Sequence, residues 1–485
     1  MTKQNTITQL FADCLPAHNI LANEESMKPY ECDALTAYKT VPMAVLLPDN
    51  QQQVVDIVKR CHRDNIPIVT RGAGTGLSGG ANPINNGILL NLAKLNEIYE
   101  INPGQQYARV GPGVRNLAIS DAVSQFGLYY APDPSSQIAC TIGGNIAENS
   151  GGVHCLKYGL TTHNVIEISY VNSEGEIITV GSSCYDNPGY DILALLTGSE
   201  GMLGIILEAK VKLLPKPEKT ELVLAAFNDI RDAGEAVASI IASGIIPAGL
   251  EMMDSVVIQA TEEFCQPGYP VDAEAILLCE LDGFGLLLAD QLDQVKQQFQ
   301  KHNASSIKTA ASEQEQELLW KGRKSAFPAI GQLAPDYLCM DGTIPRKHLA
   351  YVLEKIKYFS AQYELPVANV FHAGDGNLHP LIMYDANIEG QLQRAEQIGS
   401  EILQLCVQVG GTITGEHGVG VEKLNQMCVQ FKREELDQFS RLKYAFDARS
   451  ILNPGKVIPT LQRCAEFGAM HVHGGEMPFP DLPRF

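Results

Sequence analysis

Two histidines flank a short glycine-rich segment that reads Ala373-Gly374-Asp375-Gly376-Asn377. Asp-Gly is typical of a two-residue hairpin turn. With Asp375 and Gly376 as that turn, His372 and His379 face each other across two antiparallel strands, with Cβ atoms about 5 Å apart. A longer loop would break this register. Two imidazoles so placed can share a divalent metal ion, although a histidine taken alone is more often a hydrogen-bonded structural residue.

A second polar cluster reads Gly415-Glu416-His417-Gly418-Val419-Gly420, with an acid and a histidine among glycines. It suggests a third metal ligand, because zinc sites commonly combine histidine with a carboxylate. A third candidate is Arg323, which lies beside the only tryptophan, Trp320. A planar guanidinium binds a carboxylate better than an ammonium does. The alternative is a solvated charge on an amphipathic helix.

Three glycine-dense segments precede these clusters: the first glycine loop (71–80), the second (141–152) and the third (198–205). The first fits Gly-x-Gly-x-x-Gly, the nicotinamide-dinucleotide fingerprint, which requires a helix after the last glycine. Pro83 and the Asn-Gly pair at 86–87 make a helix improbable, so this interpretation fails. A single such loop could be a flexible surface segment. Three loops in one domain favour a cradle for one long, phosphate-bearing ligand.

The elements that must position these residues form two different patterns. Apolar strands near 44–47 and 66–69 flank a helix that begins after residue 50, and glycine-marked strands continue to residue 214. The proline-containing segment at 214–218 indicates a boundary. Beyond it, strands and helices alternate as in an α+β domain with a largely antiparallel sheet. We expect domains at 1–217 and 218–430, and a helical segment and tail at 431–485.

Composition excludes some classes of function. The net charge is −20 over 485 residues, which opposes binding to nucleic acid or to an anionic membrane surface. No apolar run is long enough to span a bilayer, and the start of the chain lacks a signal-peptide pattern. The twelve cysteines include no Cys-x-x-Cys pair, so any iron–sulfur centre is expected on another subunit. We expect a cytoplasmic protein.

The three glycine loops, together with Pro132-Asp133-Pro134-Ser135-Ser136 between them, resemble the FAD-binding domain of the vanillyl-alcohol oxidase/p-cresol methylhydroxylase superfamily. The resemblance covers nearly the whole chain and is strongest to the D-2-hydroxy-acid dehydrogenase branch. It implies an α+β fold with a two-part FAD-binding domain and an α+β substrate domain that contains an antiparallel sheet. The FAD contacts that it implies are Arg71, Gly72, Ala73, Gly74, Thr75, Gly76, Ser78, Gly79, Pro132, Asp133, Ser135, Thr141, Gly143, Gly144, Asn145, Gly151, Gly152, Glu200, Gly204, Ile205 and Asn453.

The same resemblance assigns roles to the polar clusters. It implies that His372, His379 and Glu416 bind a divalent metal, commonly zinc. It also implies that His417 is the catalytic base and that Arg323 binds the substrate carboxylate. The implied reaction is FAD-dependent oxidation of glycolate, or of a similar small 2-hydroxy acid such as D-lactate, with hydride transfer to flavin N5. Relatives that act on longer dicarboxylates have Asn where this chain has Leu381, which favours a small monocarboxylate.

Some relatives bind flavin covalently through a histidine in the first glycine loop, but this loop contains none, so we expect non-covalent FAD. We expect electrons to pass to an iron–sulfur subunit, together with a second FAD-domain subunit, and membrane contact only through such partners. One alternative is a self-sufficient D-lactate or D-2-hydroxy-acid dehydrogenase that uses a quinone or a soluble carrier. Another is a non-catalytic flavin-binding assembly subunit. In the tail, His471 and His473 could bind metal, but a contact with a partner subunit is favoured.

Overall fold

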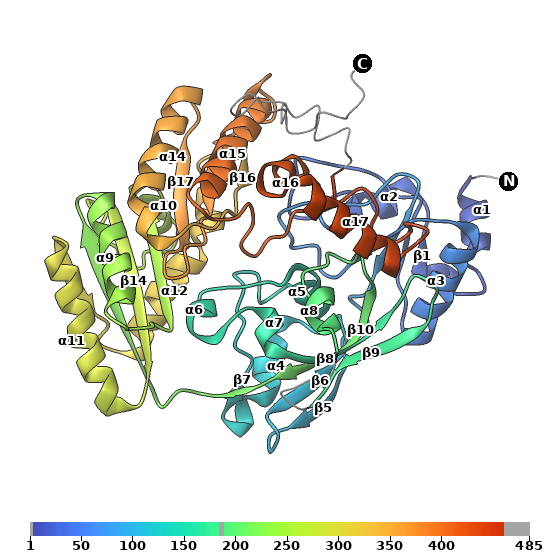
Figure 1. Ribbon diagram of the computed structural model, residues 1–485, viewed down its shortest axis with the longest axis horizontal. Helices are drawn as coiled ribbons and strands as arrows, with labels where there is room; N and C mark the ends of the chain where they lie inside the picture. The colour runs from blue at the N-terminus through green and yellow to red at the C-terminus, as the bar shows by residue number, and fades with distance from the viewer. Residues whose placement is uncertain (1–2, 184–188, 460–485) are drawn as a thin grey trace. The chain divides into compact units, whose positions relative to one another are not determined.

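The computed structural model describes residues 3–183 and 189–459 (Figure 1). His471 and His473 lie outside these residues. The chain separates into two compact units. The first unit contains residues 1–150, 160–215 and 416–485, and the second contains 151–159 and 216–415. The predicted division at residues 217 and 430 stays a prediction.

The first unit contains a four-stranded sheet in the order β1-β2-β4-β3. Its strands are β1 (Ile20–Leu21), β2 (Ala44–Leu46), β3 (Ile68–Arg71) and β4 (Ile88–Asn91). Helix α3 (Gln51–Asp64) begins where the Asn50 side chain accepts a hydrogen bond from the N–H of Gln53, a standard N-cap. The buried positions of α3, Val54, Val58 and Cys61, join the apolar core of this sheet. This strand–helix–strand order confirms the elements expected around residues 44–69.

A five-stranded antiparallel sheet in the order β5-β6-β10-β8-β9 completes the first unit (Figure 1). Its strands are β5 (Ile98–Asn102), β6 (Tyr107–Val110), β8 (Val165–Val171), β9 (Ile177–Gly181) and β10 (Ile205–Lys212). Strands β7 (Leu128–Tyr129) and β11 (Leu214–Pro215) pair separately. The unit also contains helices α1 (Lys3–Leu10), α2 (Glu24–Met27), α4 (Asn116–Val123), α5 (Ile142–Glu148), α7 (Thr161–Asn164), α8 (Ile192–Leu196), α16 (Leu424–Gln430) and α17 (Arg433–Phe446).

The second unit is built on a seven-stranded antiparallel sheet in the order β15-β12-β14-β13-β17-β18-β16. Its strands are β12 (Lys219–Phe227), β13 (Gly249–Asp254), β14 (Ala275–Gly283), β15 (Ser306–Thr309), β16 (Asp336–Cys339), β17 (Val367–His372) and β18 (Pro380–Tyr384). The antiparallel sheet expected for the substrate domain is therefore present.

Helices cover this sheet, and α9, α11, α14 and α15 pack against its strands and one another (Figure 1). The helices of the unit are α6 (Cys155–Tyr158), α9 (Ile230–Ala242), α10 (Ser255–Cys265), α11 (Gly285–Lys301), α12 (Glu313–Lys324), α13 (Ala326–Ile330), α14 (Leu349–Tyr363) and α15 (Gln391–Gln408). Among the helices that the structure describes in either unit, none combines the length and apolar content needed to cross a bilayer.

Candidate functional site

Close packing leaves no room for a side chain at Gly72 of the first glycine loop or at Gly143 of the second. A Cβ on Gly72 would lie 2.1 Å from the Thr141 hydroxyl oxygen, and one on Gly143 would lie 2.7 Å from the Pro112 side chain. Thr141 also caps α5 by accepting a hydrogen bond from the N–H of Gly144. Turns and bends, rather than a helix, connect β3 to β4. This confirms that the first glycine loop is not a nicotinamide-dinucleotide fingerprint.

The side chain of Arg71 packs against the backbone of the first glycine loop. Its guanidinium donates a 2.5 Å hydrogen bond to the carbonyl of Cys32, and it fills the place that a Cβ on Gly74 would occupy. Gly74 has φ +74, a backbone conformation that glycine adopts without strain. Burial lowers the pKa of Arg71. In this arrangement the Arg71 side chain braces the loop.

The segment after α17 returns to the glycine loops. The Asn453 side-chain amide donates to the carbonyls of Gly80 (3.0 Å) and Glu200 (2.6 Å), so it joins the first and third glycine loops. The Lys456 ammonium donates to the carbonyls of Gly80 (2.7 Å) and Asn82 (2.5 Å). The segment around residues 453–456 therefore contacts the glycine loops of the first unit.

The turn that follows His417 is held by the same loops. The Glu200 carboxylate accepts hydrogen bonds from the N–H groups of Val419 (2.6 Å) and Gly420 (2.7 Å). The Ser78 carbonyl accepts one from Val421 at 3.0 Å. A Cβ on Gly420 would lie 2.1 Å from that carbonyl oxygen, so a glycine is required there.

Three acids of the first unit lie near these loops: Asp33 and Glu200 are buried, and Glu148 is half-buried. Burial raises the pKa of Asp33 to about 6. Burial also raises the pKa of Glu148 and of Glu200, and the two N–H groups that Glu200 accepts from oppose its shift. The pKa of Lys456 falls to about 8, because burial disfavours its charge more than the nearby acids stabilise it. Burial therefore favours the neutral forms of these three acids and of Lys456, which all lie near the glycine loops.

The remaining implied FAD contacts are placed in different ways. Asn116 joins two of them, because its amide donates to the Pro132 carbonyl and to the Asn145 side chain, both at 3.0 Å. Gly204 packs against the Tyr170 ring, where a Cβ would lie 2.3 Å away. Gly151 and Gly152 belong to the second unit. Asp133 is half-buried, Ser135 is exposed, and Ile205 begins β10.

The chemistry of the first unit fits an FAD dinucleotide. Among the described residues, no group hydrogen-bonds to the Ser78 hydroxyl or to the Asn453 side-chain oxygen, although both atoms are buried. A buried polar atom without a partner is costly unless a ligand or water satisfies it. These atoms are therefore suited to a polar ligand held by the loops.

The histidine hairpin has a different register from the expected one. Strands β17 and β18 pair Val367 with Ile382 and Asn369 with Pro380, and the same register pairs His372 with Asn377. The loop therefore has four residues, 373–376, and the predicted two-residue Asp-Gly turn was wrong. His379 lies two positions beyond Asn377, so it is a diagonal neighbour of His372 on the same face. The two imidazole centroids are still only 5.1 Å apart.

A buried glutamate connects His372 with Arg323. Glu251 in β13 places Oε1 2.7 Å from His372 Nδ1, and Oε2 accepts a 2.7 Å hydrogen bond from Arg323 Nε. Glu251 is fully buried and Arg323 is 1% exposed, so the alternative interpretation of Arg323 as a solvated charge on an amphipathic helix is excluded. Burial alone would raise the pKa of Glu251, but the neighbouring His372 and Arg323, which also hydrogen-bond to it, hold it below its usual value.

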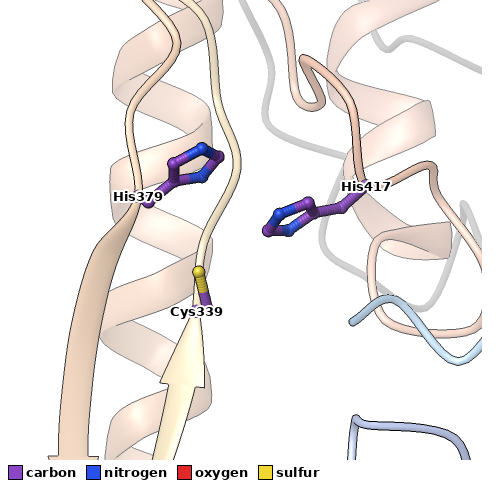
Figure 2. A group of neighbouring side chains, drawn as sticks. All are labelled: Cys339, His379 and His417. Carbon is purple, nitrogen blue, oxygen red and sulfur yellow. The ribbon is translucent and has the colours of Figure 1, made fainter. Parts of the chain in front are cut away.

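A second buried acid, Asp341, supports the other histidine. Its carboxylate lies 3.9 Å from His379 Nδ1 and accepts hydrogen bonds from the Thr414 hydroxyl (2.6 Å) and the Gly415 N–H (3.0 Å). Figure 2 shows the His379 ring beside the thiol of Cys339 at the end of β16, and their ligand atoms lie within 4.8 Å. These donor types suit zinc. In the first unit, Glu416 and His417 likewise place ligand atoms within 4.8 Å of each other.

Sequence reasoning missed Glu251, Asp341 and Cys339. Glu251 was detectable, because a single acid inside the apolar run Gly249-Leu250-Glu251-Met252-Met253 requires a buried partner. Asp341 and Cys339 gave no such signal, since their proximity to His379 depends on the pairing of β16 with β18.

Comparison with known proteins matches both parts of the chain to family models. Residues 42–181 match the FAD binding domain family, and residues 216–457 match the family described as FAD linked oxidases, C-terminal domain. The chain is 57% identical over 482 residues to glycolate oxidase subunit GlcD of Escherichia coli (strain K12), which covers 99% of this chain and 97% of the relative. It is 32% identical to a D-lactate dehydrogenase of Archaeoglobus fulgidus, over 86% of this chain and 91% of the relative.

The solved structure of p-cresol methylhydroxylase with substrate bound superposes with a TM-score of 0.79. The match covers 95% of this chain and 98% of that structure, at 18% sequence identity. At this identity the likeness shows the fold alone. It confirms the expected two-part FAD-binding domain with an α+β substrate domain.

Proposed function

Since the chain belongs to the FAD-linked oxidases of the vanillyl-alcohol oxidase/p-cresol methylhydroxylase superfamily, we propose that it oxidises glycolate, or a similar small 2-hydroxy acid, to the 2-oxo acid. When bound, FAD supplies the acceptor for hydride from the substrate α-carbon. The observation that carries the proposal is the buried arrangement of Glu251, His372 and Arg323. A non-catalytic assembly subunit would not need a buried arginine that is linked through a glutamate to a buried histidine.

Arg323 is proposed to bind the substrate carboxylate. Its Nε donates to Glu251, whereas its buried Nη2 lies 2.7 Å from the same oxygen without the alignment of a hydrogen bond. Its remaining N–H groups suit a planar carboxylate. Leu381, fully buried two residues after His379, provides no polar partner for a second carboxylate. A short monocarboxylate is therefore favoured.

His372, His379 and Glu416 are proposed to hold a divalent metal, with zinc favoured by the donor types. Such a metal, when bound, lowers the pKa of the substrate hydroxyl. Glu416 follows Gly415 directly, and the Gly415 N–H is hydrogen-bonded to Asp341 beside His379. Chain connectivity thus supports the inclusion of Glu416. His417 is proposed to accept the hydroxyl proton as the general base.

The electrons are proposed to pass from FAD to a partner subunit that carries an iron–sulfur centre. A second FAD-domain subunit is proposed to belong to the same assembly. The assembly is proposed to lie in the cytoplasm, or at the inner face of the membrane through its partner subunits. The subunit designation of the Escherichia coli relative supports an assembly. The second candidate is a self-sufficient D-lactate dehydrogenase that uses a quinone or a soluble carrier, which the Archaeoglobus relative supports. Co-purification of an iron–sulfur subunit separates the two.

The deciding experiment mixes the FAD-loaded protein anaerobically with glycolate, each lactate enantiomer and D-2-hydroxyglutarate, and follows the flavin absorbance. We expect bleaching with glycolate or D-lactate and little with the dicarboxylate. Failure of every 2-hydroxy acid to bleach a fully loaded flavin would contradict the proposed activity. Faster bleaching by D-2-hydroxyglutarate would contradict the assignment to a small monocarboxylate.

A further inference from the structure

Glu251 occupies a position from which one carboxylate controls two proposed functional residues. It lies in β13, a strand buried at every position and flanked by β14 and β17. In the register of β13 with β17, Glu251 is the direct cross-strand partner of His372. Arg323 reaches the same carboxylate from helix α12. A side chain in the middle of a packed sheet has few available rotamers, so the Glu251 carboxylate is held in a position that contacts both His372 and Arg323.

The direction of the hydrogen bond to His372 follows from the chemistry of the acceptor. The always-charged guanidinium of Arg323 donates to Glu251 and favours its ionised form, and an ionised carboxylate can only accept. His372 Nδ1 must then carry its proton, and the lone pair of the neutral ring is at Nε2. An imidazole held in this way by a carboxylate is the usual form of a histidine that binds metal through its other nitrogen. The opposite tautomer would present an N–H to the metal.

We infer that Glu251 is a positioning residue that fixes His372 in the tautomer able to bind metal through Nε2 and, with its other oxygen, fixes Arg323 to receive the substrate carboxylate. This inference rests on the proposed function. One carboxylate thereby aligns the group that binds the hydroxyl end of the substrate with the group that binds its acid end. The alternative is that Glu251 only neutralises the buried charge of Arg323.

Two substitutions distinguish the tautomer-fixing role from a role in packing or charge neutralisation. One changes the hydrogen-bonding character of the side chain and keeps its size, and the other does the reverse. Glu251→Gln keeps the size of the side chain, and its oxygen can still accept from Arg323, but its amide then donates to His372 Nδ1 and forces the proton onto Nε2. Glu251→Asp keeps an acceptor-only group but is one methylene shorter. A tautomer role therefore predicts that Asp preserves more function than Gln, whereas a packing role predicts the reverse order.

Glu280 in β14 offers a matched control. It is also a buried acid that contacts a histidine and a second donor, with His154 Nε2 at 3.0 Å and Trp320 Nε1 at 2.6 Å. Neither of these two partners is proposed to bind the metal or the substrate. Glu280→Gln therefore makes the same chemical change in the adjacent strand, without altering His372 or Arg323.

The experiment uses the full-length, FAD-loaded protein and its three variants. Zinc affinity is measured by titration of the metal-free proteins, FAD content by absorbance, and kcat and KM with glycolate. We expect Glu251→Gln to retain FAD, to lose zinc affinity by about 10- to 100-fold and to raise KM, with Asp intermediate and Glu280→Gln unchanged. Wild-type zinc affinity and KM in a folded Glu251→Gln variant would overturn the inference, as would a variant order in which Asp is worse than Gln.

A second readout does not depend on the variants folding. Nitrogen-15 spectra of histidine-labelled, metal-free wild-type protein distinguish the two tautomers, and His372→Gln identifies the signal. We expect His372 protonated at Nδ1, and protonation at Nε2 alone would overturn the inference. Failure of the wild-type flavin to be reduced by any 2-hydroxy acid would instead contradict the proposed function and leave the tautomer result standing on its own.

Discussion

The side-chain oxygen Oε1 of Glu200 lies 2.6 Å from the backbone nitrogen of Val419, two residues after His417. Its other oxygen accepts from Gly420, so both oxygens of one buried carboxylate hold a single turn. Glu200 belongs to the third glycine loop, whose backbone is tied to the first by Asn453. The backbone that carries the proposed base is therefore anchored in the loops proposed to hold FAD.

This anchoring predicts that Glu200→Gln slows flavin reduction by glycolate about 10-fold or more while FAD stays bound. The amide has only one acceptor oxygen, so one of the two N–H groups of the turn loses its partner, at a cost of about 1–3 kcal/mol. Rapid-mixing absorbance gives the rate, and the flavin-to-protein absorbance ratio gives FAD content. Glu208→Gln, which removes an ion pair with Arg109 at 2.9 Å, is the control. Loss of FAD at an unchanged rate per bound flavin would show that Glu200 serves only the cofactor.

His417→Ala is expected to reduce the rate of flavin reduction by about 10²- to 10⁴-fold, the usual contribution of a general base. FAD content should not change, because the backbone of the neighbouring turn supplies the contacts with Glu200. The exposed His18 gives the control substitution, His18→Ala. Normal reduction of the flavin in the His417 variant would remove the proposed base from the mechanism.

The histidine hairpin shows what sequence alone could and could not determine. The apolar runs before His372 and after His379 correctly predicted two antiparallel strands, and the pair remained on one face. The register was wrong because Asp-Gly was given a two-residue turn, whereas the loop has four residues. The predicted cross-strand partner of His372 was wrong by two residues. Because side chains on a strand alternate with a period of two, His372 and His379 still lie on the same face of the sheet. A shift of one residue would have separated the imidazoles.

The partners of Arg323 mark the limit of sequence reasoning. The residue type indicated a carboxylate ligand, but its burial and its pairing with Glu251 depend on a contact between α12 and β13, which joins residues 72 positions apart in the chain. The glycine loops were easier to interpret, because the glycines and Pro83 act locally on the backbone. Local chemistry was therefore predictable, and contacts distant in sequence were not.

Arg323→Lys is expected to raise KM for glycolate by about 10- to 100-fold, with FAD content unchanged. Lysine keeps the charge beside Glu251 but cannot bind two oxygens of a planar carboxylate at once. Initial rates over a range of glycolate concentrations, measured with an artificial electron acceptor, give KM. Lys324→Met, on the exposed face of the same helix, is the control. An unchanged KM would place the carboxylate-binding residue elsewhere.

FAD is expected to be released when the protein is denatured, because the first glycine loop offers no histidine for a covalent bond. Acid precipitation followed by absorbance of the supernatant measures the free flavin. Gly72→Ala provides a test of the cradle, since its Cβ would meet the Thr141 hydroxyl at 2.1 Å. We expect this variant to retain less FAD. Flavin that stays with the precipitated wild-type protein would contradict the non-covalent assignment.

Asp33 should make the stability of the protein depend on pH. Burial raises its pKa from 3.8 to about 6, and among the described residues no group hydrogen-bonds to its buried Oδ2. Between these values the folded protein holds a proton that the unfolded chain has released. The protonated Asp33 carboxyl group therefore contributes fully to the free energy of unfolding below about pH 4, and this contribution is lost as pH rises through about 6. The loss is at most about 3 kcal/mol, at 1.36 kcal/mol per pKa unit.

Asp33→Asn removes this titration while keeping an oxygen that can accept from the N–H of Leu35, as Asp33 does at 2.9 Å. Urea unfolding of the FAD-loaded proteins at about pH 5 and about pH 7.5 gives the difference in unfolding free energy between variant and wild type. Because the wild-type carboxylate is forced to ionise in a buried position at the higher pH, the variant should gain relative stability there, by about 1 kcal/mol. Asp121→Asn, on the exposed surface of α4, should show no such change. An equal stability difference at both pH values would mean that Asp33 is already ionised at the lower one, held so by Lys456 and Arg71.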